Sequence, residues 1–208
     1  MITIETIAKR EEEITGKPPR IPSRRTEEVL VPAREMMGKI SGAASGKAAP
    51  VSDEDISEML LTAMCHRELF ERLVNVSMQL LKDPKLPLRD RQLVILSVGW
   101  IRQIPYIWGE HVIVSKKLGL SSEDIEAVTV GSSSTHWNDH ERAVIRAAEE
   151  LIANTMISDE CWEVLAQQYN EQQLFELPIL VGQFSTVGYF QNALRIPLSA
   201  INKGLNAR

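Results

Sequence analysis

The feature that most constrains the fold is the stretch of residues 88 to 120, whose first half is apolar in every direction. Within Leu93–Ile101 only one serine and one glycine interrupt the apolar residues. A helix with no polar face is buried on all sides, so this segment predicts the central helix of a helical bundle. Pro105 lacks a backbone donor and disfavours helical geometry at the residue before it, which predicts a break there. A second helix is then expected from Pro105 to a left-handed glycine cap at Gly119.

The second helix of this predicted hairpin carries ionisable residues in apolar surroundings. Residues three and four apart share a helix face, so Trp108 and His111 lie on one stripe, with Tyr106 and Glu110 on a stripe beside it. Burial would lower the pKa of His111, whereas the carboxylate of Glu110 would raise it. An imidazole balanced near neutrality suits proton transfer, which makes His111 a candidate general acid or base. The ordinary alternative is a core histidine, with Tyr106 and Trp108 serving only in packing.

At these positions the sequence resembles the carboxymuconolactone decarboxylase family, which includes the AhpD-like proteins linked to peroxidases. The most specific part of the resemblance is the pattern Tyr106-x-Trp108-x-x-His111, and the likeness runs from about residue 51 to 198. It implies an all-α fold, an AhpD-like helical bundle with a central helical hairpin. It also implies a homo-trimer or homo-hexamer in which the histidine helix lines the active site.

Two departures from the family pattern bear on the chemistry. AhpD-like members have a CxxC pair at the positions held here by Ile104 and Ile107, so dithiol–disulfide chemistry at this site is excluded. Where the family commonly has a glutamate in the preceding helix, this chain has Gln92, which forms hydrogen bonds but cannot take a proton. If the family glutamate acts as an acid or base, that role is either absent from this chain or is carried by another residue. Glu110 is the obvious substitute.

The resemblance implies a cofactor-free, decarboxylase-like enzyme that acts on a small oxygenated carboxylic acid or lactone. In this interpretation His111 returns a proton to carbon after the carboxylate is lost, and Gln92 donates a hydrogen bond to the developing enolate. The other candidate residues are Glu110 as the partner of His111, Tyr106 and Trp108 as the pocket wall, and Arg102 and Arg195 as anchors of the substrate carboxylate.

Two other functions remain open on the same scaffold. A histidine beside a glutamate could catalyse a dehydration, an isomerisation or a retro-aldol step, which a product that keeps its carboxylate would indicate. A binding or assembly protein without catalysis is the other alternative. An imidazole that keeps one protonation state from about pH 5 to about pH 9 would favour this last function.

The remaining histidines and the two cysteines carry weaker signals. His136 and His140 have the i, i+4 spacing of metal ligands, but they straddle a predicted helix start and lack further ligands, so we expect no metal site. His66, at a helix joint, either lines a pocket or lies at the surface. Cys65 and Cys161 are far apart in predicted helices and are expected to be reduced thiols.

Composition limits the class of protein. A chain of 208 residues with 44% hydrophobic content can form one sizeable helical domain, expected at residues 51–208, with an N-terminal extension at residues 1–50. The formal net charge of −5 argues against a general nucleic-acid binder. Neither a signal core nor an apolar run of membrane-spanning length is found, so we expect a cytoplasmic protein. The expected partner is a small-molecule substrate, with neither nucleic acid nor membrane.

The extension is predicted to contain two helices, at residues 1–15 and 26–40, joined by a proline-rich extended stretch. Pro32 limits where the second of these helices can begin. Residues 41–50, rich in glycine, alanine and serine, are expected to form a loop. Such an extension either wraps a neighbouring subunit, closes over a pocket or forms a surface arm.

In the domain, the other helices are predicted from apolar periodicity and from capping residues. The helix at residues 68–82 is expected to direct Leu69, Leu73, Val76 and Leu80 inward. Further helices are expected at residues 139–153, 159–169 and 171–194. The predicted caps are Ser52 with Asp55, Ser121 with Asp124, Asn170 with Gln173, Asp139 alone and Ser158 alone.

Overall fold

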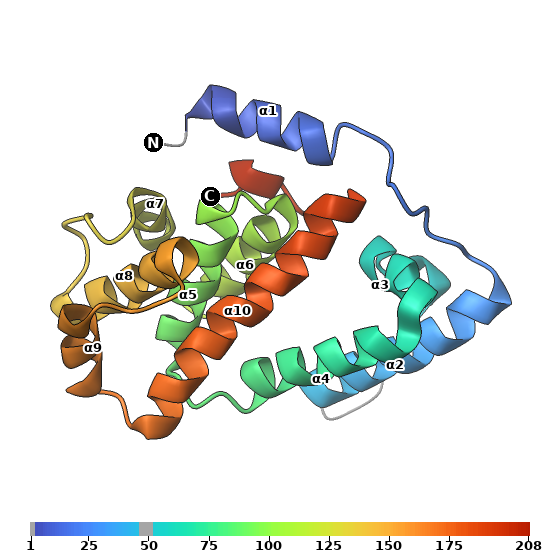
Figure 1. Cartoon of the computed structure of the whole chain (residues 1–208). Coiled ribbons are helices and arrows are strands. Elements are labelled where there is room, and N and C mark those ends of the chain that lie inside the picture. The colour runs from blue at the N-terminus through green and yellow to red at the C-terminus, as the bar shows by residue number, and fades with distance from the viewer. Residues whose placement is uncertain (1–2, 46–51) are drawn as a thin grey trace.

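Two buried helices at the centre of the molecule organise the fold (Figure 1). The structure is a computed structural model that describes residues 3–45 and 52–208. In helix α5 (Leu88–Ile101) every residue from Asp90 to Trp100 is buried. Helix α6 (Pro105–Lys117) starts at its proline, directly after an extended residue, and Gly119 with φ 94° follows its end. The predicted hairpin is therefore confirmed.

Four helices that follow the hairpin pack around it: α7 (Ser122–Val130), α8 (Asp139–Asn154), α9 (Asp159–Ala166) and α10 (Glu171–Leu194). Helices α7, α8 and α10 contact α5 directly, whereas α9 packs on α8. Their apolar side chains join those of the hairpin in the main core, where Leu96, Trp108, Ile145 and Leu177 are fully buried. Other helices thus surround the central hairpin, as its sequence predicts.

The N-terminal elements form a second, smaller unit beside α10: α2 (Glu27–Ser45), α3 (Glu58–Ala63) and α4 (Arg67–Lys82), with 3-10 turns at Asp53–Asp55 and Met64–His66. These helices share a core that includes Leu30, Met36, Leu60 and Phe70. Helix α4 also contacts α10, and Figure 1 shows α2 and α4 lying alongside each other. The described residues contain helices and no strand, which confirms the all-α fold class.

Helix α1 (Ile4–Ile14) lies apart from α2, over the C-terminal segment of residues 196–208 (Figure 1). Glu11 holds the two together. Its Oε1 accepts a hydrogen bond from the backbone N–H of Leu205 at 2.6 Å, and its Oε2 accepts one from Asn206 Nδ2 at 2.8 Å. Ile7 is buried in the main core. The first helix of the extension therefore contacts the core of its own chain.

The C-terminal segment packs closely against α6. Trp108 donates its indole N–H to the carbonyl of Ala207 at 3.0 Å, and Asn202 donates to the carbonyl of Tyr106 at 3.1 Å. A Cβ at Gly109 would collide with the side chain of Asn202, so only glycine leaves room for the segment here. No helix in the described ranges is long and apolar enough to cross a membrane.

Two of the predicted capping boxes are confirmed. At the start of α7, Ser121 and Asp124 exchange side-chain-to-backbone hydrogen bonds. At the start of α10, Asn170 and Gln173 do the same. Ser158 occupies the N-cap position of α9 as predicted, although its side chain forms no cap hydrogen bond with that helix. Reciprocal caps of this kind satisfy backbone donors that the first turn of a helix leaves free.

Two predicted helix starts are wrong by a few residues. Ser52 precedes a 3-10 turn that ends at Asp55 and has no side-chain cap, and α3 begins only after Ser57, whose hydroxyl accepts from the amide three residues on. Helix α8 begins after Asn138, whose side chain caps it, so Asp139 is already helical. At both places several residues able to cap stand close together, and composition does not choose among them.

Helices α2, α4 and α9 differ from prediction in four further ways. Helix α2 includes Pro32 in its second turn, so the proline does not set its start. It also continues through residues 41–45, which were predicted as loop, while residues 46–50 lie outside the described residues. Helix α9 ends at Ala166 rather than 169. In α4, Leu80 is buried as predicted, but Leu69 and Val76 are 49% and 41% exposed, because apolar residues occupy more than one face of this helix.

Candidate functional site

A small polar group lies between the two central helices. It consists of Gln92 from α5 and of His111 and Ser115, one turn apart on α6. Gln92 is completely buried, and its Oε1 lies 3.1 Å from His111 Nδ1 and 3.0 Å from Ser115 Oγ. An amide oxygen only accepts hydrogen bonds, so Nδ1 of His111 carries the proton and Nε2 keeps its lone pair. The imidazole also meets the ring of Phe184 in α10 edge-on, with centroids 5.2 Å apart.

The surroundings of His111 keep its imidazole neutral. Desolvation is the larger cause and the positive charge of Arg91 the smaller, and together they lower the pKa of His111 to about 3. Arg91 is itself buried and donates to the carbonyls of Leu80 and Leu81. Its Nε and the Nε2 of Gln92 are buried with no partner in the described part of the chain. Buried donors without partners are rare in proteins, and these two could bind an oxygen that carries negative charge.

Sequence reasoning did not single out Arg91. An arginine in the first turn of a helix normally points to solvent, so nothing in the pattern marked it as buried. The available signal was its position next to Gln92, directly before the apolar stretch that begins at Leu93.

Glu110 points to a different side of α6 from His111. Its Oε1 accepts from Asn202 Nδ2 at 3.0 Å and from Ser199 Oγ at 3.2 Å, both in the C-terminal segment. Successive helical residues point about 100° apart, which explains why neighbours in sequence do not meet. Burial, and to a smaller extent the charge of Glu110, raises the pKa of Tyr106 to about 12. The partner of His111 in this structure is therefore an amide rather than the adjacent carboxylate.

Trp108 is fully buried within the core. The centroid of its ring lies 4.8 Å from that of Trp100, and its N–H donates a hydrogen bond to the C-terminal segment. Tyr106 is partly exposed and neighbours Glu110 on the other side of the helix. Both residues thus contact the C-terminal segment or the core rather than the imidazole of His111.

Arg102 and Arg195 come together at a separate place, a cavity of about 760 Å³ at the C-terminal ends of α5 and α10. Helix α1 and the residues after it form the opposite side of this cavity. Neither His111 nor Gln92 is among its lining residues. The candidate residues thus fall into two groups, the His111 pair within the hairpin and the arginines at this cavity.

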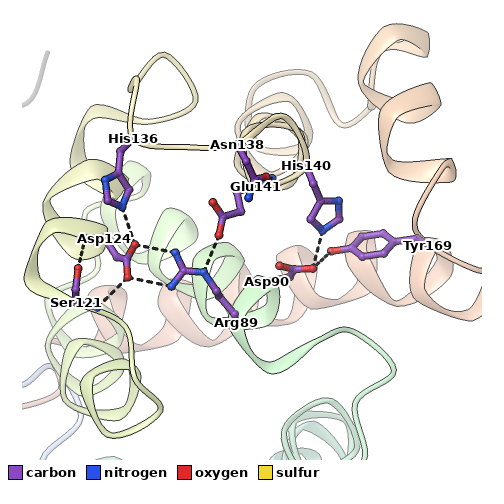
Figure 2. Close-up of polar contacts among 9 residues, drawn as sticks. All are labelled: Arg89, Asp90, Ser121, Asp124, His136, Asn138, His140, Glu141 and Tyr169. Carbon is purple, nitrogen blue, oxygen red and sulfur yellow. Dashed lines mark hydrogen bonds and ion pairs between the residues drawn. The ribbon is translucent and has the colours of Figure 1, made fainter.

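A third polar group surrounds the N-terminal end of α5 (Figure 2). Arg89 donates two hydrogen bonds to Asp124, at 2.9 and 2.7 Å, and one to Glu141 at 2.6 Å. His136 Nε2 lies 2.7 Å from the same Asp124 carboxylate. The hydrogen bonds from Arg89, with a smaller contribution from His136, outweigh the opposing effect of desolvation and hold the pKa of Asp124 below its usual value. This group ties α5 to α7 and α8.

The neighbouring Asp90 is buried and accepts two hydrogen bonds on one oxygen. Tyr169 donates its hydroxyl at 2.6 Å, and His140 Nε2 lies 2.8 Å away (Figure 2). His136 and His140 therefore serve different carboxylates. Among residues 3–45 and 52–208 no cluster of three or more potential ligands could hold a metal ion.

The remaining candidates lie away from these groups. His66 is exposed at the joint before α4. Cys65 is exposed and Cys161 is buried, and both are free thiols. Burial raises the pKa of Cys161 to about 11, so this thiol is inert at neutral pH.

Comparison with known proteins supports the family resemblance over part of the chain. Residues 67–150 match the profile of the Carboxymuconolactone decarboxylase family, which confirms the resemblance seen in the sequence. The matched span runs from α4 to α8 and includes both Gln92 and His111. Among curated proteins, none matches this chain significantly.

Several solved structures share the fold. An uncharacterized peroxidase-related protein with an AhpD core, from Ralstonia eutropha JMP134, has a TM-score of 0.71 at 14% identity, over 88% of this chain and 94% of that one. A peroxidase-related protein from Silicibacter sp. TM1040 gives 0.69 at 16% identity, over 90% and 97%. The debrominase Bmp8 gives 0.66 at 13% identity, over 88% and 94%, and a variant of it has been solved with 2,3,4-tribromopyrrole. These likenesses show that the chain has an AhpD-like fold.

Proposed function

We propose that this chain, whose residues 67–150 belong to the carboxymuconolactone decarboxylase family, is an enzyme that forms an enolate from a small oxygenated carboxylic acid or lactone. One observation carries the proposal. His111 is neutral and forms a hydrogen bond with Gln92, and the Nε2 of Gln92 and the Nε of Arg91 are buried N–H donors that have no partner in the described chain. Such donors suit an oxygen on which negative charge develops during a reaction.

The chemistry follows from the charge that an enolate carries. When CO₂ leaves a β-keto acid, the electrons of the broken carbon–carbon bond move onto the carbonyl oxygen, and abstraction of a proton beside a carbonyl has the same result. The field of Arg91 and the N–H of Gln92 would stabilise that oxygen without reorganising, because packing already fixes them. Nε2 of His111 would take up the proton in transit and return it to carbon.

The low pKa of His111 bears on whether the imidazole begins the reaction by accepting or by donating a proton. With a pKa of about 3 the imidazole is neutral at physiological pH, so in the resting protein it accepts a proton rather than donating one. A bound carboxylate would raise this pKa, since nearby negative charge favours the imidazolium. The resting state thus supports a second candidate, an isomerase, dehydratase or retro-aldol lyase, in which proton abstraction starts the reaction.

A non-catalytic protein on the same scaffold is supported by a different observation. An imidazole that stays neutral from about pH 5 to about 9, with Glu110 engaged elsewhere, is what a structural histidine would show. An apolar groove of about 660 Å³ between α4 and α10, which includes Val76 and the 73% exposed Phe175, favours self-association. We propose a homo-trimer or homo-hexamer, to be measured by light scattering on the eluting protein.

Turnover of a substrate panel tests the proposal. The protein is incubated in D₂O with β-keto acids and lactones, and NMR follows both CO₂ loss and deuterium uptake at carbon. We expect His111→Gln to reduce the rate by about 100-fold or more, the range of general acid–base catalysis. His66→Gln, at an exposed histidine, is the matched control and should keep the full rate.

The possible results separate the three functions. Release of CO₂ that depends on His111 supports the decarboxylase, and deuterium uptake with the carboxylate retained supports the second candidate. A rate in His111→Gln within a few-fold of the original refutes the role of His111. Absence of turnover across the panel, with the oligomer intact, supports the non-catalytic alternative.

A further inference from the structure

We infer that the cavity between α1 and the C-terminal ends of α5 and α10 is a binding site for a small organic molecule that carries at least two negatively charged oxyanion groups. Its volume of about 760 Å³ lies within the range of small-molecule sites. The inference goes beyond the proposed function, because neither His111 nor Gln92 lines this cavity.

Positive charge is concentrated around the cavity. Its lining includes one acidic side chain, Glu13, whose carboxylate lies 3.5 Å from Arg10. The C-terminal ends of α5 and α10 together add about one further negative charge. About three positive charges therefore remain on a chain whose formal net charge is −5, and an anion with several charges would balance them. The basic lining residues are Arg10, Lys17, Arg20, Arg102 and Arg195.

Two of these arginines each use one guanidinium nitrogen in a hydrogen bond, which leaves their other guanidinium nitrogens available to a ligand. Arg102 donates its Nε to Ser185 Oγ at 3.1 Å and stacks over the ring of Tyr189, 5.2 Å from its centroid. Arg20 donates one nitrogen to the carbonyl of Ala193 at 3.1 Å. A guanidinium fixed in this way can bind a carboxylate or a phosphate with two parallel hydrogen bonds.

Two residues that follow the ends of α5 and α10 have a left-handed backbone, which is common after a helix. Gln103 and Arg195 have φ values of 51° and 56°, in the left-handed region that residues other than glycine seldom adopt. The carbonyl of Gln103 accepts from Arg10 Nε at 3.4 Å and from Asn192 Nδ2 at 3.2 Å. These two bonds hold Arg10 and Asn192, which both line the cavity.

An unsatisfied acceptor indicates a further property of the ligand. Asn192 lines the cavity, and its Oδ1 is buried with no hydrogen-bond donor among the described residues. A hydroxyl group would supply that donor. Ile14, Ile101 and Ile104 provide an apolar surface for the carbon skeleton. The lining thus fits a hydroxylated di- or tricarboxylate or a sugar phosphate, which share the required oxyanions and hydroxyl.

Neutralisation of the negative C-terminal ends of α5 and α10 does not account for the number of basic residues at the cavity. An arginine at the end of a helix often satisfies the last carbonyls, and Arg20 does so for α10. Lys17 and Arg195, however, form no ion pair within residues 3–45 and 52–208. Two helix ends with one carboxylate do not require five cations.

Calorimetric titration of the full chain with citrate and with pyrophosphate, at fixed ionic strength, tests the inference. Acetate supplies the single-charge comparison. We expect saturable binding of one citrate or pyrophosphate per chain, and much weaker binding of acetate. Preference for citrate over pyrophosphate would indicate a hydroxycarboxylate, and the reverse a phosphate ester.

Two variants and a control locate the binding. Arg195→Asn removes a charge while asparagine tolerates the left-handed backbone, so it should fold normally yet bind at least about tenfold more weakly. Arg102→Gln should act similarly. Arg72→Gln, at an exposed arginine of α4, should bind as the original does.

The inference is overturned if citrate and pyrophosphate bind no better than acetate, or if Arg72→Gln weakens binding as much as Arg195→Asn does. Binding is measured without turnover, so its failure leaves the proposed reaction at His111 untouched. Loss of turnover in His111→Gln likewise has no bearing on the anion site.

Discussion

Replacing Gln92 by glutamate should move the titration of His111 toward neutral pH. The amide oxygen of Gln92 lies 3.1 Å from His111 Nδ1 and carries no net charge. Gln92→Glu places a carboxylate at the same point with nearly the same volume. Negative charge at hydrogen-bond distance favours the imidazolium, so the pKa of His111 should rise from about 3.

The size of the shift follows from the distance. Two unit charges about 4 Å apart attract by roughly 4 kcal/mol at an effective dielectric constant of about 20. That energy corresponds to about three pKa units, and the cost of keeping the carboxylate itself charged while buried reduces it. We therefore expect a rise of about one to three units, which brings the pKa of His111 to roughly 4 to 6.

Titration of the imidazole C2 proton by NMR from pH 3 to pH 8 measures this shift. Gln92→Met is the matched control, because it removes the hydrogen bond without adding charge and should leave the pKa of His111 low. The argument is refuted if His111 in Gln92→Glu titrates at or below its original pKa. It is equally refuted if the methionine variant shifts the pKa upward as far as the glutamate variant does.

Three stability predictions concern other parts of the fold. Asp124→Asn should cost about 2 kcal/mol at pH 7, less than the 3–5 typical of a fully buried pair because Arg89 is 40% exposed. The folded pKa of Asp124 is depressed below 3.8, so this stabilisation is present above about pH 4 and is lost as the pH falls through the folded pKa. Urea unfolding curves of the variant and the original protein should therefore converge in acid. Tyr169→Phe should cost about 1–2 kcal/mol in the same assay, because it removes a buried hydroxyl donor from Asp90, and an unchanged midpoint would contradict this. Gly109→Ala should lower stability by about 1–3 kcal/mol and make the C-terminal segment sensitive to protease, whereas unaltered cleavage would show that the segment has room to move.

The hairpin and most helices could be predicted because apolar pattern and capping chemistry are local. A helix that is apolar all round must be central, and a proline such as Pro105 is favoured in the first turn of a helix, so α5 and α6 follow from their own residues. Where several capping residues adjoin, as at Asn138 and Asp139, the tertiary fit decides between them. The sequence therefore places helices more reliably than it places their ends.

The contacts of the candidate site could not be predicted in the same way. Which neighbour meets His111 depends on how α6 is rotated against α5 and on where the C-terminal segment lies. That segment takes up Glu110 and leaves Gln92 next to the imidazole. The cavity that holds Arg102 and Arg195 is bounded on one side by α1, which lies about 90 and about 180 residues away from them in sequence, and no local pattern predicts such a pairing.

The hydrogen bonds from Glu11 to residues 205 and 206 set an order on folding. They join positions more than 190 residues apart, so α1, although translated early, cannot dock on a ribosome-bound chain until the C-terminal segment has emerged. During that interval the apolar face of α1 has no partner to cover it. A chaperone that binds nascent chains would find this helix exposed until residues 205 and 206 have emerged.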